Sequence, residues 1–211
     1  MSSPFPSIPE VLPEGQCGIA KVQHFEVSKA DSDFTSIRAM FSSGGRGEYV
    51  PPGKYAQLFV GRELMMSDTS MERQSNREVV RQAHGHVFIA GLGLGMILHP
   101  ILNNPTVTKV TVVEKYADVI RLVAHTLPHQ EKLEVIEADV LDWKPAKGTK
   151  YDVVYFDIWP TICIDNLEQM ALLHRRFAHF KAPGAWMNSW LKADLQDRKR
   201  RNAMQRRTRW F

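Results

Sequence analysis

The chain has 211 residues, 44% hydrophobic and 24% charged, an ordinary composition for a globular protein with one good core. It has no apolar run of the roughly 18 residues that a membrane-spanning helix needs, and its first residues lack the basic and apolar parts of a secretory signal. We therefore exclude membrane and secreted classes and expect a soluble, cytoplasmic protein.

The net charge of +4 is distributed unevenly. Residues 192–211 hold eight Lys or Arg and two Asp, a net charge of +6, whereas the other 191 residues carry a net charge of −2. The favoured interpretation of this tail is a solvated terminal helix or a frayed end, since no aromatic side chains are interleaved with it before Trp210. The alternative is a nucleic-acid contact, because clustered basic side chains neutralise phosphates.

The first part of the chain predicts a lead-in to the main domain. Residues 1–16 are rich in proline and predict a flexible arm. Residues 17–85 predict a β-rich region without a core of its own. Its expected elements are a strand over 19–28, a short helix capped by Asp31 or Ser32, a hairpin turning at Gly61 and Arg62, and one long helix capped by Ser67 or Asp68 and ended by Gly85.

From His86 to residue 191 the pattern alternates between strands and helices. Alternation of this kind predicts an α/β fold with a mostly parallel, Rossmann-like sheet and helices on both faces. After the fifth strand only the basic segment 192–211 remains, so we expect the sheet to end there. A partner or a second copy would then cover its open edge, which makes a homo-oligomer one expectation. The expected strands are 86–91, 109–114, 133–139, 151–157 and 184–190, and the expected helices are 96–104, 116–127 and 165–180, the last with Asp165 and Glu168 as a capping box.

Residues suited to holding a nucleoside follow the first four of these strands. Gly91, Gly93 and Gly95 come directly after the first strand, where glycine permits a sharp turn and close approach of a ligand. Glu114 ends the second strand, 19 positions after Gly95, where a carboxylate accepts hydrogen bonds from ribose hydroxyls. Asp139 and Asp157 end the third and fourth strands. Ligands bind at the carboxyl ends of such strands, so these residues predict one site.

The spacing of the glycines distinguishes two cofactors. A dinucleotide fold needs GxGxxG or GxGxxA, but here Met96 stands at the third small position and the third glycine falls one residue earlier. This GxGxG pattern resembles motif I of the class I S-adenosylmethionine-dependent methyltransferases, over about residues 86–190. An NAD-dependent oxidoreductase is correspondingly disfavoured.

The resemblance implies roles for individual residues. The glycine loop would face the methionine and ribose parts of the cofactor, with Glu114 at the ribose and its neighbour Lys115 also among the cofactor-binding residues. Asp139, with Val140 beside it, would contact the adenine. Asp157 would lie beside the sulfonium and act as the catalytic base, while Trp159 and Pro160 would contact the substrate. Trp159 has an alternative interpretation as packing at the sheet edge.

The lead-in is similar to that of the spermidine-synthase-like branch. A hairpin and a helix precede the glycine loop, and Ile89 stands where most methyltransferases have an acid. The aminopropyltransferases of that branch carry several acids after the fourth strand, whereas this loop has Asp157 alone, followed by Ile, Trp and Pro. Glu72 and Arg73, in the preceding helix, are expected to be exposed. The leading prediction is therefore methyl transfer to a small-molecule or macromolecular acceptor that the sequence does not identify.

Two alternatives stay open at this point. One is aminopropyl transfer, and the other is a non-catalytic cofactor-binding protein whose basic tail binds nucleic acid or a partner. The histidines and cysteines have no metal-ligand spacing, so no metal is predicted.

Overall fold

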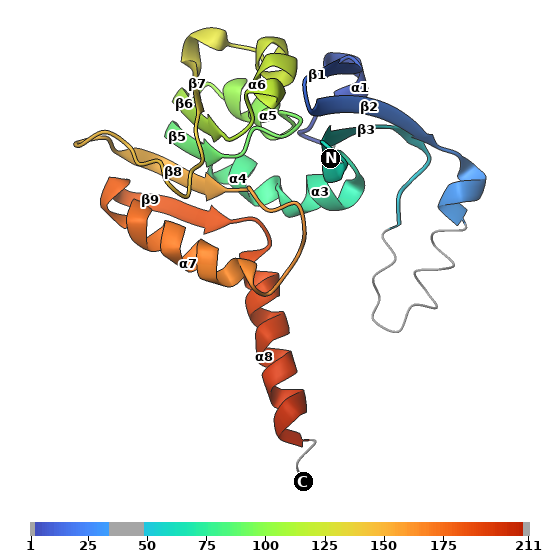
Figure 1. Ribbon diagram of the computed structural model, residues 1–211. Helices are drawn as coiled ribbons and strands as arrows, with labels where there is room; N and C mark the ends of the chain where they lie inside the picture. Colours follow the sequence, from blue (N-terminus) through green and yellow to red (C-terminus); the bar gives the residue numbers. More distant parts are fainter. Residues whose placement is uncertain (1–2, 34–48, 209–211) are drawn as a thin grey trace.

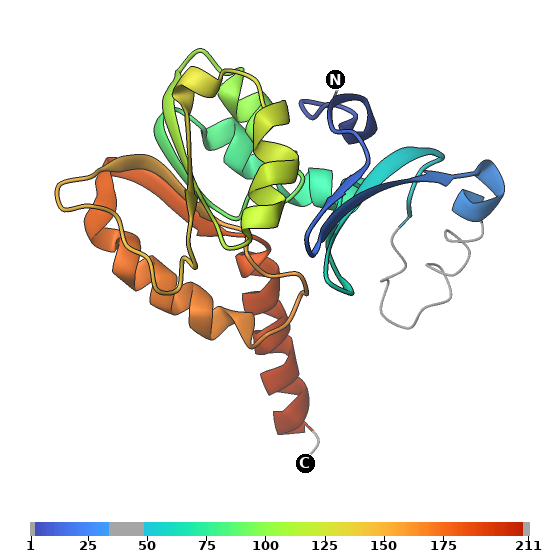
Figure 2. The ribbon, with the colours of Figure 1, turned by 45° about the horizontal axis from the view of Figure 1, so that its top comes forward.

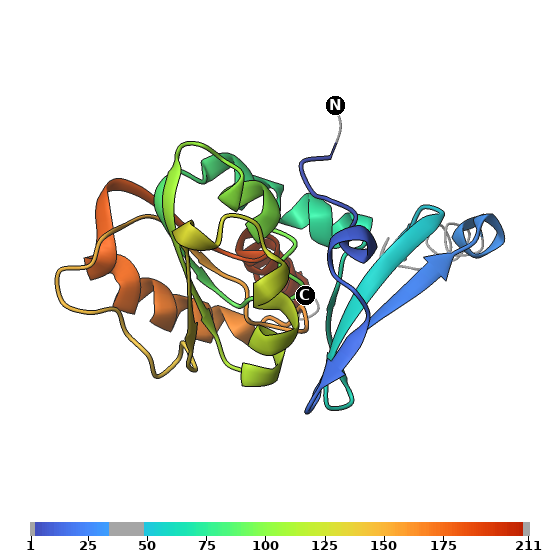
Figure 3. The ribbon, with the colours of Figure 1, turned by 90° about the horizontal axis from the view of Figure 1, so that it is seen from above.

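The computed structural model describes residues 3–33 and 49–208, which form two sheets side by side (Figures 1 and 3). An antiparallel sheet has the strand order β1-β2-β3-β4, and a second sheet has the order β7-β6-β5-β8-β9. In the described ranges, no helix is both long enough and apolar enough to cross a bilayer.

The described part of the proline-rich start is packed, which corrects the expectation of a flexible arm. Residues Ile8–Val11 form α1, with Pro9 in its first turn, where proline is tolerated. Phe5, Ile8 and Leu12 are buried in the main hydrophobic core. Three apolar side chains at this spacing anchor the segment despite its prolines.

The antiparallel sheet confirms the predicted strand and hairpin. Gly61, with φ of 61°, makes the turn between β3 and β4. The helix expected after β2 begins at residue 29, and the Ser28 hydroxyl accepts the Asp31 N–H at 3.2 Å, so Ser28 caps it in place of Asp31 or Ser32. The remainder of that predicted helix lies outside the described residues. The strands are β1 (Gly15–Cys17), β2 (Ala20–Val27), β3 (Gly53–Val60) and β4 (Glu63–Ser67).

The prediction of a single long helix before β5 is wrong, because this segment forms two short helices. These are α3 (Ser70–Ser75) and α4 (Arg77–Gln82), and they meet at Asn76. Asn76 is buried, and its side chain accepts a hydrogen bond from the Tyr155 hydroxyl at 2.9 Å. Thr69 takes the N-cap position, and Gly85 opens the next strand.

The second sheet is parallel throughout and confirms the predicted architecture. All of its pairings are parallel, and within the described residues it ends at the fifth strand. Its outer strands, β7 and β9, each pair with one neighbour there, and coverage of these edges by a second copy stays a prediction. The strands are β5 (Gly85–Ala90), β6 (Val107–Glu114), β7 (Leu133–Glu137), β8 (Tyr151–Phe156) and β9 (Lys181–Ser189).

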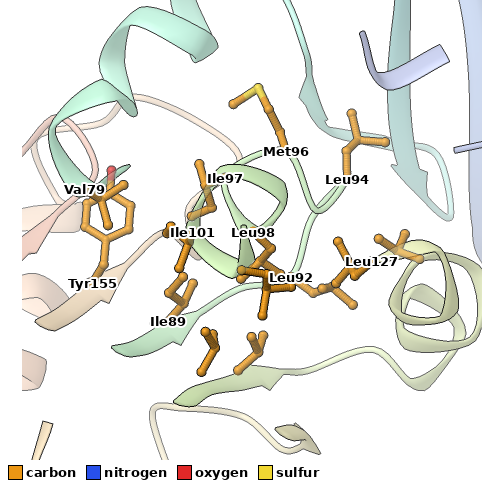
Figure 4. Close-up of a cluster of buried hydrophobic side chains, with 14 of the residues drawn as sticks. Val79, Ile89, Leu92, Leu94, Met96, Ile97, Leu98, Ile101, Leu127 and Tyr155 are labelled. Carbon is orange, nitrogen blue, oxygen red and sulfur yellow. The ribbon is translucent and has the colours of Figure 1, made fainter. Parts of the chain in front are cut away.

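Helices cover both faces of this sheet (Figure 2). Val87 and Ile89 of β5 belong to one core cluster, whereas Phe88 and Ala90 belong to another, as the alternation of side chains along a strand requires. Figure 4 shows the first cluster, where side chains from α5 and the preceding loop pack near Ile89. The first face carries α4, α5 (Leu98–Leu102) and α6 (Ala117–Val123), and the second carries α7 (Asn166–Phe177) and the start of α8 (Lys192–Thr208).

Short 3-10 turns follow some of the helices. Residues Ala124–Thr126 extend α6, Gln130–Lys132 precede β7, and Ala178–Phe180 follow α7. The capping box predicted at the start of α7 does not form, since Asp165 makes no side-chain capping hydrogen bond there.

Candidate cofactor and substrate cavity

A cavity of about 300 Å³ opens at the carboxyl ends of the parallel strands. This is the position where α/β sheets bind ligands, and the volume is at the lower end for small-molecule sites. One wall comes from the parallel sheet and the other from β3 and β4. Nine of the ten residues predicted for the site line it, namely Gly91, Gly93, Glu114, Lys115, Asp139, Val140, Asp157, Trp159 and Pro160.

Gly91 and Gly93 are required by close contacts in the loop after β5. Gly91 has φ of 98°, and a side chain there would collide with the backbone carbonyl of Asp157. Gly93 has φ of 53°, and a side chain there would collide with the sulfur of Met66 from β4. The Met66 sulfur also accepts the Leu94 N–H at 3.2 Å. The loop is therefore held between the two sheets.

Gly95, the tenth predicted residue, has a different role. It does not line the cavity, and its φ is 72°. A Cβ atom at this position would lie 2.8 Å from Leu127 Cδ2 and 3.2 Å from Val123 Cγ1. The third glycine thus makes room for the end of α6 and the turn after it, and the structure does not place it among the cavity residues.

Glu114 is fixed by two backbone hydrogen bonds. Its Oε2 atom accepts the Leu92 N–H at 2.8 Å, and its Oε1 atom accepts the Tyr116 N–H at 2.9 Å. The residue is only 7% exposed. Each carboxylate oxygen keeps a second lone pair, so the side chain braces the glycine loop and can still accept from a ligand hydroxyl.

Asp139 and Lys115 form an ion pair at the edge of the cavity. Asp139 Oδ2 lies 3.0 Å from Lys115 Nζ, and Asp139 Oδ1 accepts the Leu141 N–H at 2.9 Å. Burial opposes ionisation of Asp139, but the Leu141 N–H and the Lys115 ammonium outweigh it and hold the pKa of Asp139 below its usual value. Asp139 is therefore an ionised acceptor.

Asp157 lines the cavity and lies next to a buried polar network of Asn76 and Tyr155. Burial raises the pKa of Asp157 to about 7, although a hydrogen bond from Asn76 acts in the opposite direction. Burial and the charges of Asp157 and Glu72 raise the pKa of Tyr155 well above its usual value, so both carboxylates lie near that hydroxyl. A carboxyl with this pKa exchanges a proton near neutral pH.

Two tryptophans are fixed in the cavity wall. Trp159 is 7% exposed, and its indole N–H donates to Gln169 Oε1 at 2.7 Å. Trp190 is 5% exposed, and its indole N–H donates to Ser75 Oγ at 2.9 Å. Both rings line the cavity, so Trp159 both packs in the core and faces the site.

Several cavity residues could not be predicted from the sequence. Glu72, which was expected to be exposed, is 9% exposed and lines the cavity, because α3 packs between the two sheets. No local pattern marks these positions, since their places depend on how the antiparallel sheet and α3 pack against the glycine loop. The missed residues include Leu58, Val60, Glu63, Met65, Met66, Glu72, Tyr116, Gln169 and Trp190.

The cavity lining has more acidic than basic groups. Five carboxyl groups line it, from Glu63, Glu72, Glu114, Asp139 and Asp157, against one ammonium, from Lys115. Because the pKa of Asp157 is about 7, that carboxyl is only partly ionised at neutral pH, and the other acids still outnumber the ammonium. A partly enclosed wall of this kind attracts a cation and repels an anion.

Comparisons with known proteins find similarity to parts of solved structures. No family model matches the chain, and a search of curated proteins finds no match. Among solved structures, a DhpI–SAM–HEP complex is 18% identical over 56% of this chain and 53% of its own, with a TM-score of 0.44. The N-methyltransferase NodS from Bradyrhizobium japonicum WM9, with S-adenosyl-L-homocysteine, is 14% identical over 58% of this chain and 62% of its own, with a TM-score of 0.46.

A third solved structure gives a similar result. The mitomycin 7-O-methyltransferase MmcR is 16% identical over 57% of this chain and 37% of its own, with a TM-score of 0.42. The matched regions thus span less than two thirds of each of these three proteins. Likenesses of this size carry no conclusion about activity, which must come from the residues of the chain itself.

Proposed function

We propose that the chain is an S-adenosylmethionine-dependent methyltransferase that binds its cofactor in this cavity. The observation that carries the proposal is the lining of five carboxylates and one ammonium beside a glycine loop at the carboxyl ends of parallel strands. The sulfonium of this cofactor is a cation, which such a lining attracts. The pyrophosphate of a dinucleotide is an anion, which argues against NAD.

Each predicted binding residue has a group suited to one part of the cofactor. The loop at Gly91 and Gly93 would approach the ribose and the methionine part, and Glu114 would accept from the ribose hydroxyls. Asp139, with its lowered pKa, would accept from the adenine amine beside Val140. The Lys115 ammonium competes for the same carboxylate, since the two side chains are paired.

The proposed reaction is a direct displacement at the methyl carbon. A lone pair on the acceptor forms the new bond, and the electron pair of the breaking C–S bond goes to sulfur. Asp157 takes the acceptor's proton, because its pKa of about 7 allows it to be ionised before the step and protonated after it. Trp159 and Trp190, held by their indole N–H groups, restrict the acceptor to an in-line approach.

Aminopropyl transfer is the second candidate, and one observation keeps it open. The sequence offers a single acid after β8, but in the structure Glu72 also lines the cavity and lies, like Asp157, near the Tyr155 hydroxyl. Two carboxylates beside two indoles are suited to an amine-bearing acceptor, whichever group is transferred. The donor therefore decides between the two reactions.

Calorimetric titration tests the proposal. We expect S-adenosylmethionine and S-adenosylhomocysteine to bind to the full chain with micromolar affinity, and Glu114→Gln to weaken both about 10- to 100-fold, as expected for lost hydrogen bonds to a charged group. The matched control is Glu137→Gln, an exposed carboxylate at the end of β7 that does not line the cavity, which should leave affinity unchanged.

The other titrations decide between the candidates. Clear preference for decarboxylated S-adenosylmethionine would replace methyl transfer by aminopropyl transfer. Binding of NAD alone, or of none of these molecules, would refute the proposal.

A further inference from the structure

We propose that α8 docks in the major groove of duplex DNA. The helix projects away from both sheets, and its C-terminal half lies clear of the other elements (Figures 1 and 2). Its first turns contact the body through Leu195, which is 1% exposed, and through Arg198, whose Nη1 atom donates to the Ile162 carbonyl at 3.4 Å. Lys192 Nζ also lies 3.1 Å from His174 Nδ1. Residues 199–205 are exposed.

The direction of α8 is set by its junction with β9. Leu191 has φ of 50°, a left-handed conformation that is unfavourable for a residue other than glycine. The conformation is held by Trp190 and Leu195, which are buried on either side of it. The projection of the helix is thus built into the packing of the core.

The composition of α8 favours a polyanion over an apolar partner. Beyond the first turns, its described apolar side chains are Ala203 and Met204, which form no apolar stripe. A helix that is polar on all sides does not gain by packing on a protein core or lying in a membrane. Its charge does complement a phosphate backbone, since residues 192–211 carry a net charge of +6.

The placement of the charges fits a groove with phosphates on both sides. Arg198, Lys199, Arg200 and Arg201 are consecutive, and successive residues of a helix point about 100° apart, so the four side chains extend to all sides. Arg200 is also paired with Asp197 at 2.9 Å. A helix about 10–12 Å wide fits the major groove of B-form DNA, about 12 Å wide, between two phosphate backbones.

The length of the projecting part agrees with this arrangement. Arg198 to Thr208 spans about 16 Å at 1.5 Å per residue, which is about five base pairs. The major groove of A-form RNA is deep and narrow and does not admit a helix in this way. The inference rests on charge, direction and length, and not on the proposed methyl transfer.

Fluorescence anisotropy of the full chain with a labelled 20-base-pair DNA duplex tests the proposal. We expect salt-dependent binding, and we expect the double variant Lys199→Glu, Arg201→Glu to weaken it at least tenfold and to lower the salt slope by about 2, or about 0.9 for each lost phosphate contact. The matched control is Lys144→Glu, Lys147→Glu, which makes the same change of charge at exposed positions between β7 and β8. It should weaken binding less than threefold.

Titrations with other nucleic acids test whether the ligand is duplex DNA. Single-stranded DNA and duplex RNA of the same sequence should bind more weakly than duplex DNA. Equal or tighter binding of either would overturn the major-groove proposal, as would no salt-dependent binding of the duplex or equal losses in the two double variants. Circular dichroism checks that α8 is still helical in each variant, and S-adenosylmethionine is left out of every arm, so these results do not bear on the cofactor site.

Discussion

The two sheets line one cavity with different kinds of groups. The strand ends of the parallel sheet contribute three of the five carboxyl groups, from Glu114, Asp139 and Asp157, together with apolar side chains. Backbone N–H groups hold Glu114 and Asp139 in place. The antiparallel sheet contributes mainly apolar side chains, among them Leu58, Met65 and Met66. The difference teaches that the parallel sheet holds most of the polar groups that can act on a ligand, while the antiparallel sheet, Glu63 apart, supplies an apolar wall.

The reason lies in the geometry of the two kinds of sheet. Parallel strands end together and are followed by loops whose N–H groups can hold carboxylates. An antiparallel sheet offers a flat face of alternating side chains, which suits apolar packing. Contacts such as the Ile19 N–H with Asp118 Oδ2, at 3.0 Å, attach that face to the parallel half of the molecule.

The largest expected effect is in the loop of the parallel sheet. Gly91→Ala should destabilise the protein by about 4 kcal/mol or more, because the new methyl group collides with the Asp157 carbonyl in addition to adopting a positive φ. Gly148→Ala is the control, since Gly148 has φ of 89° with open space around it and should cost only about 1–2 kcal/mol. If urea denaturation shows the same loss of stability in both variants, the contact between Gly91 and the Asp157 carbonyl does not require glycine.

The second effect concerns the titration of Asp157. Its pKa is about 7 when folded and about 3.9 when unfolded. Between these values the unfolded chain loses the proton while the folded chain keeps it, so the contribution of Asp157 to stability falls as pH rises and is fully lost above pH 7. Asp157→Asn does not titrate and should therefore be more stable than the parent by up to about 4 kcal/mol at pH 8, at about 1.36 kcal/mol per pKa unit, and nearly equal to it below pH 4.

Urea denaturation at intervals from pH 4 to pH 8 measures this difference. A stability difference that does not change with pH would contradict the raised pKa. The same result would remove the basis for using Asp157 as a base in the proposed reaction.

Gly91 and Asp157 also show which parts of the site could be predicted from the sequence. The glycine loop and the strand-end acids were predictable because each follows an apolar run, and a parallel sheet brings such ends together. Glu72 was not, because its burial depends on α3 packing between the two sheets. The break at Asn76 was missed for a related reason, since a hydrogen bond from the distant Tyr155 overrides the local helical pattern.

The third effect is in the attachment of the antiparallel sheet. Asp68 is fully buried, and its carboxylate accepts from the Ala56 N–H at 2.7 Å and from Arg73 Nη2 at 2.8 Å. Asp68→Ala should cost about 3 kcal/mol, because it leaves these donors unpaired. The control, Asp197→Ala, removes the exposed pair with Arg200 and should cost less than about 1 kcal/mol. Equal costs in urea denaturation would show that Asp68 does not anchor the sheet.

The smallest expected effect on stability is at Met66 of β4, whose sulfur accepts a hydrogen bond from the glycine loop. Met66→Leu keeps the volume but removes the sulfur that accepts the Leu94 N–H, so it should cost about 1 kcal/mol. Met65→Leu makes the same change at a neighbouring cavity residue with no such bond described, and it should cost less than about 0.5 kcal/mol. If the two variants shift the urea midpoint equally, β4 stabilises the glycine loop by apolar packing alone. A larger shift at Met66 would instead mean that the antiparallel sheet helps to fix the shape of the loop, through the hydrogen bond from the Leu94 N–H to the Met66 sulfur.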